Sequence, residues 1–132
     1  MSKVNYPAVF HKEDDSYWVE FPDLDGCFSS GNSLEESFKN ANEALGLYLD
    51  QKNDQYERLI KKPSKLNNII KRYPNEIVMI IEYDSLEYSK AFKTKAIKKT
   101  LTIPEWLNDA ATKANINFSS VLQEALISKL KL

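Results

Sequence analysis

Residues 4–50 read VNYPAVFHKEDDSYWVEFPDLDGCFSSGNSLEESFKNANEALGLYLD, and the fold that we expect for most of the chain follows from this stretch. Apolar residues alternate with others over 4–10 and again over 17–21, on either side of the polar segment 11–16. Alternation with a period of two is typical of β-strands that bury one face. The pattern therefore predicts a β-hairpin.

A third strand and a helix are expected directly after the hairpin. Residues 22–26, Pro-Asp-Leu-Asp-Gly, are typical of a tight turn, and a short strand over 27–30 follows them. Ser33 and Glu36 have the spacing of a capping box, in which both side chains bond backbone N–H groups at the start of a helix. Behind them apolar residues recur at steps of three and four, which predicts a helix with one buried stripe of Leu34, Phe38, Ala41, Leu45, Tyr48 and Leu49.

The following segments predict one more strand. Residues 51–75 are polar and basic, and we expect at most a short helix there, between Ser64 and Tyr73. Residues 76–83, EIVMIIEY, are rich in β-branched side chains and favour a buried fourth strand. This order gives an α+β domain of β-β-β-α-β type over residues 1–84, and we expect a linker over 85–96.

The composition of the whole chain is that of an ordinary globular protein. Its 132 residues are 42% hydrophobic and 28% charged, and no apolar run approaches the ~20 residues that a membrane-spanning helix needs. Residues 1–10 lack the pattern of a secretory signal, so we expect a cytoplasmic protein without a membrane partner. A single Cys27 and a single His11 exclude an intrachain disulfide and a zinc site built from His and Cys, and we expect no cofactor.

Charge is strongly segregated along the chain. Residues 1–57 hold 4 basic and 12 acidic side chains, whereas residues 58–75 hold 6 basic and no acidic ones. Residues 76–90 have a net charge of -3, and residues 91–132 have a net charge of +4. An acidic body favours cationic partners, and a basic tail favours anionic partners such as DNA. The alternative is that both are solvated faces without such a role.

The basic tail, residues 97–132, has the pattern of a strand followed by two helices. The segment IKKTLTI, residues 97–103, alternates between an apolar and a polar face. A first helix is expected from Pro104 to about Ala114, because Pro fits the first helical position, and Asn115 can take the left-handed conformation that ends a helix. Asn117 is a suitable N-cap for the second helix.

The strand in this tail has no local partner, and a unit of about 40 residues is rarely stable alone. The missing partner is most simply a second copy, so we expect a homodimer or tetramer with a shared core of Leu101, Ile103, Trp106, Leu122 and Leu126. A two-stranded ribbon fits the DNA major groove, where Lys98, Thr100 and Thr102 would contact bases. Asn117 and Ser119, at the start of the second helix, would contact a backbone phosphate. The alternative is an edge strand whose lysines prevent aggregation.

These tail elements resemble the ribbon-helix-helix repressors, a family that includes Arc, MetJ and CopG. The resemblance rests on the strand over 97–103, the helix that begins at Pro104, the turn at Asn115 and the second helix. Asn115 stands where this family usually carries Gly, which leaves the polar face of the strand unchanged. The resemblance implies a dimer that binds operator DNA.

Few side chains suggest catalysis. Asp23 and Asp25 could form an acid–base pair or bind magnesium, but their place in a Pro/Gly turn favours a role in the turn itself. His11, beside charged residues, is expected to be solvated, and Cys27 is expected to be a small packed side chain. The sequence shows no Ser/His/Asp set and no Gly-rich phosphate loop, so we do not expect an enzyme.

The segment from Tyr6 to Asp50 is similar to the amino-terminal domain of HicB antitoxins. The similarity is carried by Tyr17–Glu20, by FPDLDGC over 21–27 and by GNSLEES over 31–37. It implies a fold like a truncated ribonuclease H without its catalytic carboxylates. It also implies a partner, a HicA toxin, which is a small basic ribonuclease that cleaves mRNA.

Together the two resemblances imply an antitoxin that neutralises a HicA-type toxin and represses its own operon. We expect the toxin to contact the turn through Phe21, Asp23, Leu24 and Asp25, with the carboxylates in place of RNA phosphates. A stand-alone repressor whose amino-terminal domain senses a ligand is the main alternative, and a nuclease with a residual fold is a third.

Overall fold

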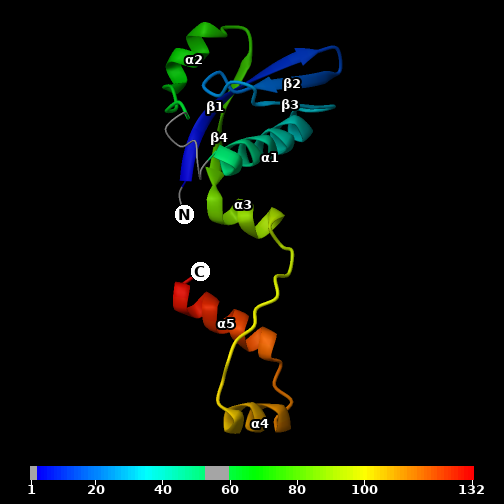
Figure 1. Cartoon of the computed structure of the whole chain (residues 1–132). Coiled ribbons are helices and arrows are strands. Elements are labelled where there is room, and N and C mark those ends of the chain that lie inside the picture. The colour runs from blue at the N-terminus through cyan, green and yellow to red at the C-terminus, as the bar shows by residue number, and fades with distance from the viewer. Residues whose placement is uncertain (1–2, 53–59) are drawn as a thin grey trace. The chain divides into compact units, whose positions relative to one another are not determined.

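The alternating segments at the start of the chain form the predicted hairpin in the computed structural model (Figure 1). Strand β1 (Lys3–Glu13) pairs antiparallel with β2 (Ser16–Glu20), and Phe10 lies opposite Val19. Asp14 lies in the connecting turn with a φ of 53°, a left-handed conformation that Asp tolerates better than most residues. The structure describes residues 3–52 and 60–132.

Two further strands complete an antiparallel sheet. β3 (Phe28–Gly31) pairs with β2, and β4 (Ile77–Asp84) pairs with β1, so the order in the sheet is β3-β2-β1-β4. The prediction of a buried fourth strand is wrong in its burial, because β4 lies at the edge and has β1 as its single neighbour among the described strands. Ile77 and Ile80 are consequently 40% and 41% exposed.

Helix α1 (Leu34–Lys52) packs on one face of the sheet and forms the core with it. Alternate residues of β1 face this helix, and the buried core consists of Tyr6, Ala8, Phe10, Val19, Phe21, Leu24, Cys27, Ala41, Leu45, Leu49, Ile81 and Tyr83. Each large apolar side chain that becomes fully buried contributes about 1.5–3 kcal/mol. The core therefore holds α1 firmly against the hairpin and β4.

The predicted capping box begins α1 in a slightly shifted form. The Ser33 hydroxyl accepts a hydrogen bond from the Glu36 N–H at 3.0 Å, while the Glu36 carboxylate accepts one from the Asn32 N–H at 3.4 Å. The predicted apolar stripe is wrong at Phe38, which is 38% exposed. Ser37 is fully buried instead, and its hydroxyl donates to the Leu34 carbonyl at 2.7 Å.

Helix α2 (Leu66–Arg72) lies inside the short helix predicted between Ser64 and Tyr73. It packs against β4 through Ile69, which is fully buried. Val9, which alternation directs away from α1, is also fully buried. The first two residues of the basic stretch 58–75 lie outside the described residues.

The segment expected to be a linker is mostly a helix, so that prediction is wrong. Helix α3 (Ser85–Phe92) is capped by Asp84, whose carboxylate accepts from the Leu86 and Glu87 N–H groups at 3.0 and 3.3 Å. The ring of Tyr88 packs so closely on α1 that a Cβ at Gly46 would lie 2.3 Å from it. The chain divides into two compact units after α3, Met1–Lys95 and Ala96–Leu132, which we call the first and second units.

The second unit contains the two helices expected from the sequence. Helix α4 (Glu105–Lys113) follows Pro104, and Asn115 has the left-handed φ of 56°. The Asn117 side chain accepts from the Ser120 N–H at 3.1 Å and caps α5 (Phe118–Leu130). Residues 97–103 are not a strand in the single chain, because no neighbouring strand of the same chain pairs with them among the described residues. Within the described parts, no helix combines the length and apolarity needed to cross a membrane.

Candidate functional site

Most of the turn that we expected to contact a toxin faces inward. Phe21, Asp23 and Leu24 are 2%, 4% and 3% exposed, whereas Asp25 is exposed. The turn is closed by the Leu24 N–H, which donates to the Phe21 carbonyl at 2.9 Å, and by Gly26 with a φ of 81°. The assignment of Phe21, Asp23 and Leu24 to a toxin-binding surface is therefore wrong for the chain as folded, since these side chains have almost no surface to offer.

Asp23 has a structural role that the sequence did not reveal. Its carboxylate accepts from both the N–H and the hydroxyl of Ser64, with the N–H bond at 2.8 Å, and the Lys61 ammonium lies 3.6 Å away. The Tyr6 hydroxyl donates to the Lys61 carbonyl at 2.6 Å. Asp23 and Tyr6 thus connect residues 61–64 to the hairpin. Among the described residues, no three His, Cys, Asp or Glu side chains lie together as metal ligands.

His11 is half-buried rather than solvated, which corrects a second prediction. Its ring stacks on Trp18 with a centroid distance of 4.0 Å and an interplanar angle of 16°. Its Nε2 lies 2.7 Å from the Glu20 carboxylate and its Nδ1 lies 3.4 Å from the Glu76 carboxylate. The Tyr73 hydroxyl donates to Glu20 at 3.0 Å, and burial together with this bond raises the pKa of Tyr73. The cluster joins the hairpin to the end of α2.

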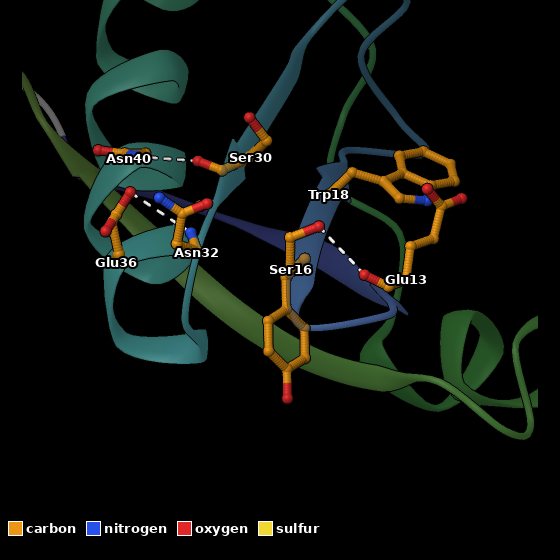
Figure 2. Close-up of a pocket in the computed structure, with 9 residues that line it drawn as sticks. Glu13, Ser16, Trp18, Ser30, Asn32, Glu36 and Asn40 are labelled. Atoms are coloured by element: carbon orange, nitrogen blue, oxygen red, sulfur yellow. Dashed lines mark hydrogen bonds between the residues drawn. The ribbon is translucent and has the colours of Figure 1, made fainter.

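A polar hollow of about 460 Å³ lies between the hairpin, β3 and the start of α1 (Figure 2). Figure 2 shows that several of its polar groups already bond one another, as Asn40 does with the Ser30 carbonyl at 2.8 Å. The carboxylates of Glu13 and Glu36 line the hollow, and its lining includes no lysine or arginine. The hollow therefore suits a cationic or hydrogen-bonding group, but its lining brings together no nucleophile and base for catalysis.

The second unit exposes both sets of residues predicted for it. Lys98, Thr100, Thr102 and Ser119 are exposed, while the Asn117 side chain is engaged as the α5 cap. The predicted dimer core is uncovered in the single chain, with exposed fractions of 61% for Leu101, 47% for Ile103, 71% for Trp106 and 51% for Leu126, and Leu122 half-exposed. The structure brings these apolar side chains into no core within their own chain.

Two features of the structure were not predicted, although residue spacings in the sequence indicate them. Asp84 and Glu87 have the spacing of a helix start, which would have indicated α3. The two-residue turn of the hairpin sets His11 opposite Trp18, which would have indicated their contact. The partners of Asp23 had no such signal, because Ser64 lies 41 residues away in the chain.

The chain thus combines an acidic sheet-and-helix unit with a basic two-helix unit whose apolar side chains are uncovered. A family model described as the HicB-like antitoxin of bacterial toxin-antitoxin systems matches residues 6–126, and the chain belongs to this family. It is 32% identical over 108 residues to an uncharacterized 14.9 kDa protein of Haemophilus phage HP1, with 77% of this chain and 74% of that protein covered.

Solved structures of toxin-antitoxin complexes contain similar chains. A chain of a complex from Streptococcus pneumoniae matches with a TM-score of 0.53 and 26% identity, and the match covers 97% of this chain and 99% of that one. A chain of the HicA3 and HicB3 toxin-antitoxin complex matches with a TM-score of 0.52 and 27% identity, over 61% of this chain and 99% of that one.

Proposed function

We propose that this chain is an antitoxin that neutralises a HicA-like toxin through its first unit and, as a homodimer or tetramer, binds operator DNA through its second unit. The family match over residues 6–126 supports the antitoxin role. The similar chain in the HicA3 and HicB3 complex supports a HicA-like partner, and the likeness to a truncated ribonuclease H stays a prediction.

The toxin-binding proposal depends on the acidic surface of the first unit. Asp25 is exposed in the turn over 22–26, and the carboxylates of Glu13 and Glu36 line the hollow in Figure 2. Acidic groups attract a protein that binds RNA phosphates, and they can occupy the surface on which RNA would lie. We infer that the first unit acts by occlusion.

The dimer proposal depends on one observation, the absence of any buried residue in the second unit of the described single chain. A folded unit needs a core of buried apolar side chains, because the burial of apolar surface offsets the conformational entropy that is lost on folding. A second copy supplies that interior if the two segments over 97–103 pair as antiparallel strands above the four helices. Lys98, Thr100 and Thr102 then face the major groove, and Ser119 with the α5 amides contacts a phosphate.

The test is co-expression of this chain with the product of the adjacent gene. We expect the two to purify together and the chain to rescue growth when the neighbour is toxic. A neighbour that is harmless, or that is toxic but neither bound nor neutralised, would reject the antitoxin role. Gel shifts with the promoter of the same operon should show binding, and a full-length chain that binds no operator at low salt would reject the repressor role.

A single lysine provides a sharper test of DNA contact. K98A should weaken operator binding, because one positive charge near the DNA phosphates is lost. The slope of the logarithm of the binding constant against the logarithm of the salt concentration should fall by about one. K39A, on α1 of the first unit, is the matched control and should leave both quantities unchanged. Fluorescence anisotropy over a salt series measures them, and an equal effect of the two variants would contradict the assignment.

A further inference from the structure

A groove of about 450 Å³ lies where α1, the end of β4 and α3 meet. Its floor is aromatic, since the rings of Tyr83 and Tyr88 are 6.0 Å apart and those of Tyr88 and Phe92 are 4.9 Å apart. Phe92 is 52% exposed, although it lies at the end of a helix that is otherwise docked on α1. The fold therefore holds an aromatic ring at the surface at the end of α3, and the contact of Tyr88 with α1 supports that helix.

Gly46 shows that this support is built into the sequence. Gly in a helix interior costs about 1 kcal/mol relative to Ala, so its place in α1 requires a compensating contact. Any Cβ at this position would lie 2.3 Å from the Tyr88 ring. The missing side chain thus lets the Tyr88 ring approach α1 closely, and the Phe92 ring packs on Tyr88.

The rim of the groove is acidic. Glu43, Glu82 and Glu87 line it against a single basic residue of the lining, Lys39, and the Glu87 carboxylate also lies 3.7 Å from the Lys90 ammonium outside the lining. Asp84 also lines it, but this carboxylate caps α3 and lies 3.9 Å from the Lys3 ammonium. An apolar floor inside a ring of carboxylates complements an apolar side chain flanked by lysine or arginine.

We propose that this groove is the docking site of the toxin on the first unit and that it receives a toxin segment with one apolar anchor between basic side chains. The inference rests on the proposed antitoxin function. A second copy of the chain fits less well, because a two-fold contact would set each acidic rim against itself. Nucleic acid is repelled by the same carboxylates.

The experiment uses the full-length chain and the neighbouring toxin, with affinity measured by calorimetry at low salt. The charge variant E43Q/E82Q/E87Q is compared with D14N/D15N/E35Q, which removes three exposed charges from the other end of the first unit. The apolar variant F92S is compared with I80S, which removes a similarly exposed side chain from the edge of β4. Thermal melting checks that every variant stays folded.

We expect both groove variants to raise Kd about tenfold or more, with both controls within about threefold of wild type. Hydrogen exchange should show α3 protected when toxin is added. Should F92S fail to fold, the charge variants still test the groove, because the side chains that they change are exposed.

Three outcomes would overturn the groove assignment while the wild-type chain still binds toxin. The first is an unchanged affinity of the groove variants for toxin, and the second is an equal loss of affinity in groove and control variants. The third is protection of the α3 amides from hydrogen exchange when no toxin is present. Protection that rises with chain concentration would indicate a second copy, and protection independent of it would indicate another segment of the same chain. Failure of the wild-type chain to bind toxin rejects the proposed function itself, and the groove assignment with it.

Discussion

Asp23 and Asp25 stand two positions apart in one turn, yet their environments differ completely. The tight turn could be predicted from the neighbouring Pro and Gly, and the structure contains it. The expected role of the Asp23 side chain in the turn itself is wrong, because its carboxylate accepts from Ser64. The burial of Asp23 could not be predicted, because it depends on a segment that returns to the turn from far along the chain. Local sequence therefore predicts the backbone of this turn better than it predicts which side chain remains free.

Loss of the Asp23 carboxylate should destabilise the first unit. We expect D23A to lower the free energy of unfolding by about 2 kcal/mol, because two hydrogen bonds to a buried charged group are lost and the Ser64 N–H is left without its partner. D25A should change it by less than about 0.5 kcal/mol, as for other exposed sites. Urea denaturation measures both, and equal effects would contradict the structural role of Asp23.

Cys27 should make the first unit sensitive to alkali. Burial raises the pKa of its thiol to about 12, whereas an unfolded thiol titrates near pH 8.5–9. Above that lower value the unfolded chain loses a proton that the folded chain keeps, so stability falls as pH rises from about 9 toward 12. The stability difference between wild type and C27A should shrink over this range in urea denaturation, and a constant difference would contradict the assignment.

Among the elements, those fixed by local pattern were predicted and those fixed by distant contacts were not. The hairpin, α1 and the helices of the second unit follow from periodicity and capping residues. The run IVMII in β4 fits a strand buried on both faces, but its place at the sheet edge depends on topology that no local pattern encodes. The polar hollow of Figure 2 and the groove beside α3 both arise where separate elements meet, so neither could be read from one segment.

Whether replacing Gly46 by Ala stabilises or destabilises the first unit should depend on the Tyr88 ring, which packs on α1. G46A should destabilise the first unit by about 1 kcal/mol or more, because the clash with Tyr88 outweighs the better helix propensity of Ala. In the Y88A background the same substitution should stabilise by up to about 1 kcal/mol. Thermal melts of the four proteins in the cycle measure the coupling, and a G46A effect that is identical in both backgrounds would exclude it.

At the scale of the whole molecule, the two units differ in where their stability originates. The first unit has its own core, whereas every described residue of the second unit is at least partly exposed in the single chain. This difference follows from length, because fewer than forty residues bury too little surface alone. The helices of the second unit could be predicted, but residues 97–103 do not form a strand in the single chain, because no described strand pairs with them.

A charge placed in the predicted dimer core should separate the copies. L126D should abolish dimer formation, reduce the helix content of the second unit and remove operator binding, because a carboxylate buried between two copies costs several kcal/mol. S120D adds the same charge to an exposed position on the face of α5 opposite Leu122 and Leu126, and it should leave the dimer intact. Sedimentation velocity and circular dichroism measure these effects, and an L126D chain that remains dimeric would contradict the proposed core.

In the proposed homodimer the second unit has a buried core only when two copies pair, so its folding depends on the concentration of the chain. When single copies predominate, halving the amount of the chain reduces the paired form to about a quarter by mass action. In the proposed repressor, repression of the operon would then fall more steeply than the concentration of the chain. A cell that degrades this chain would restart its synthesis while part of the stock is still present.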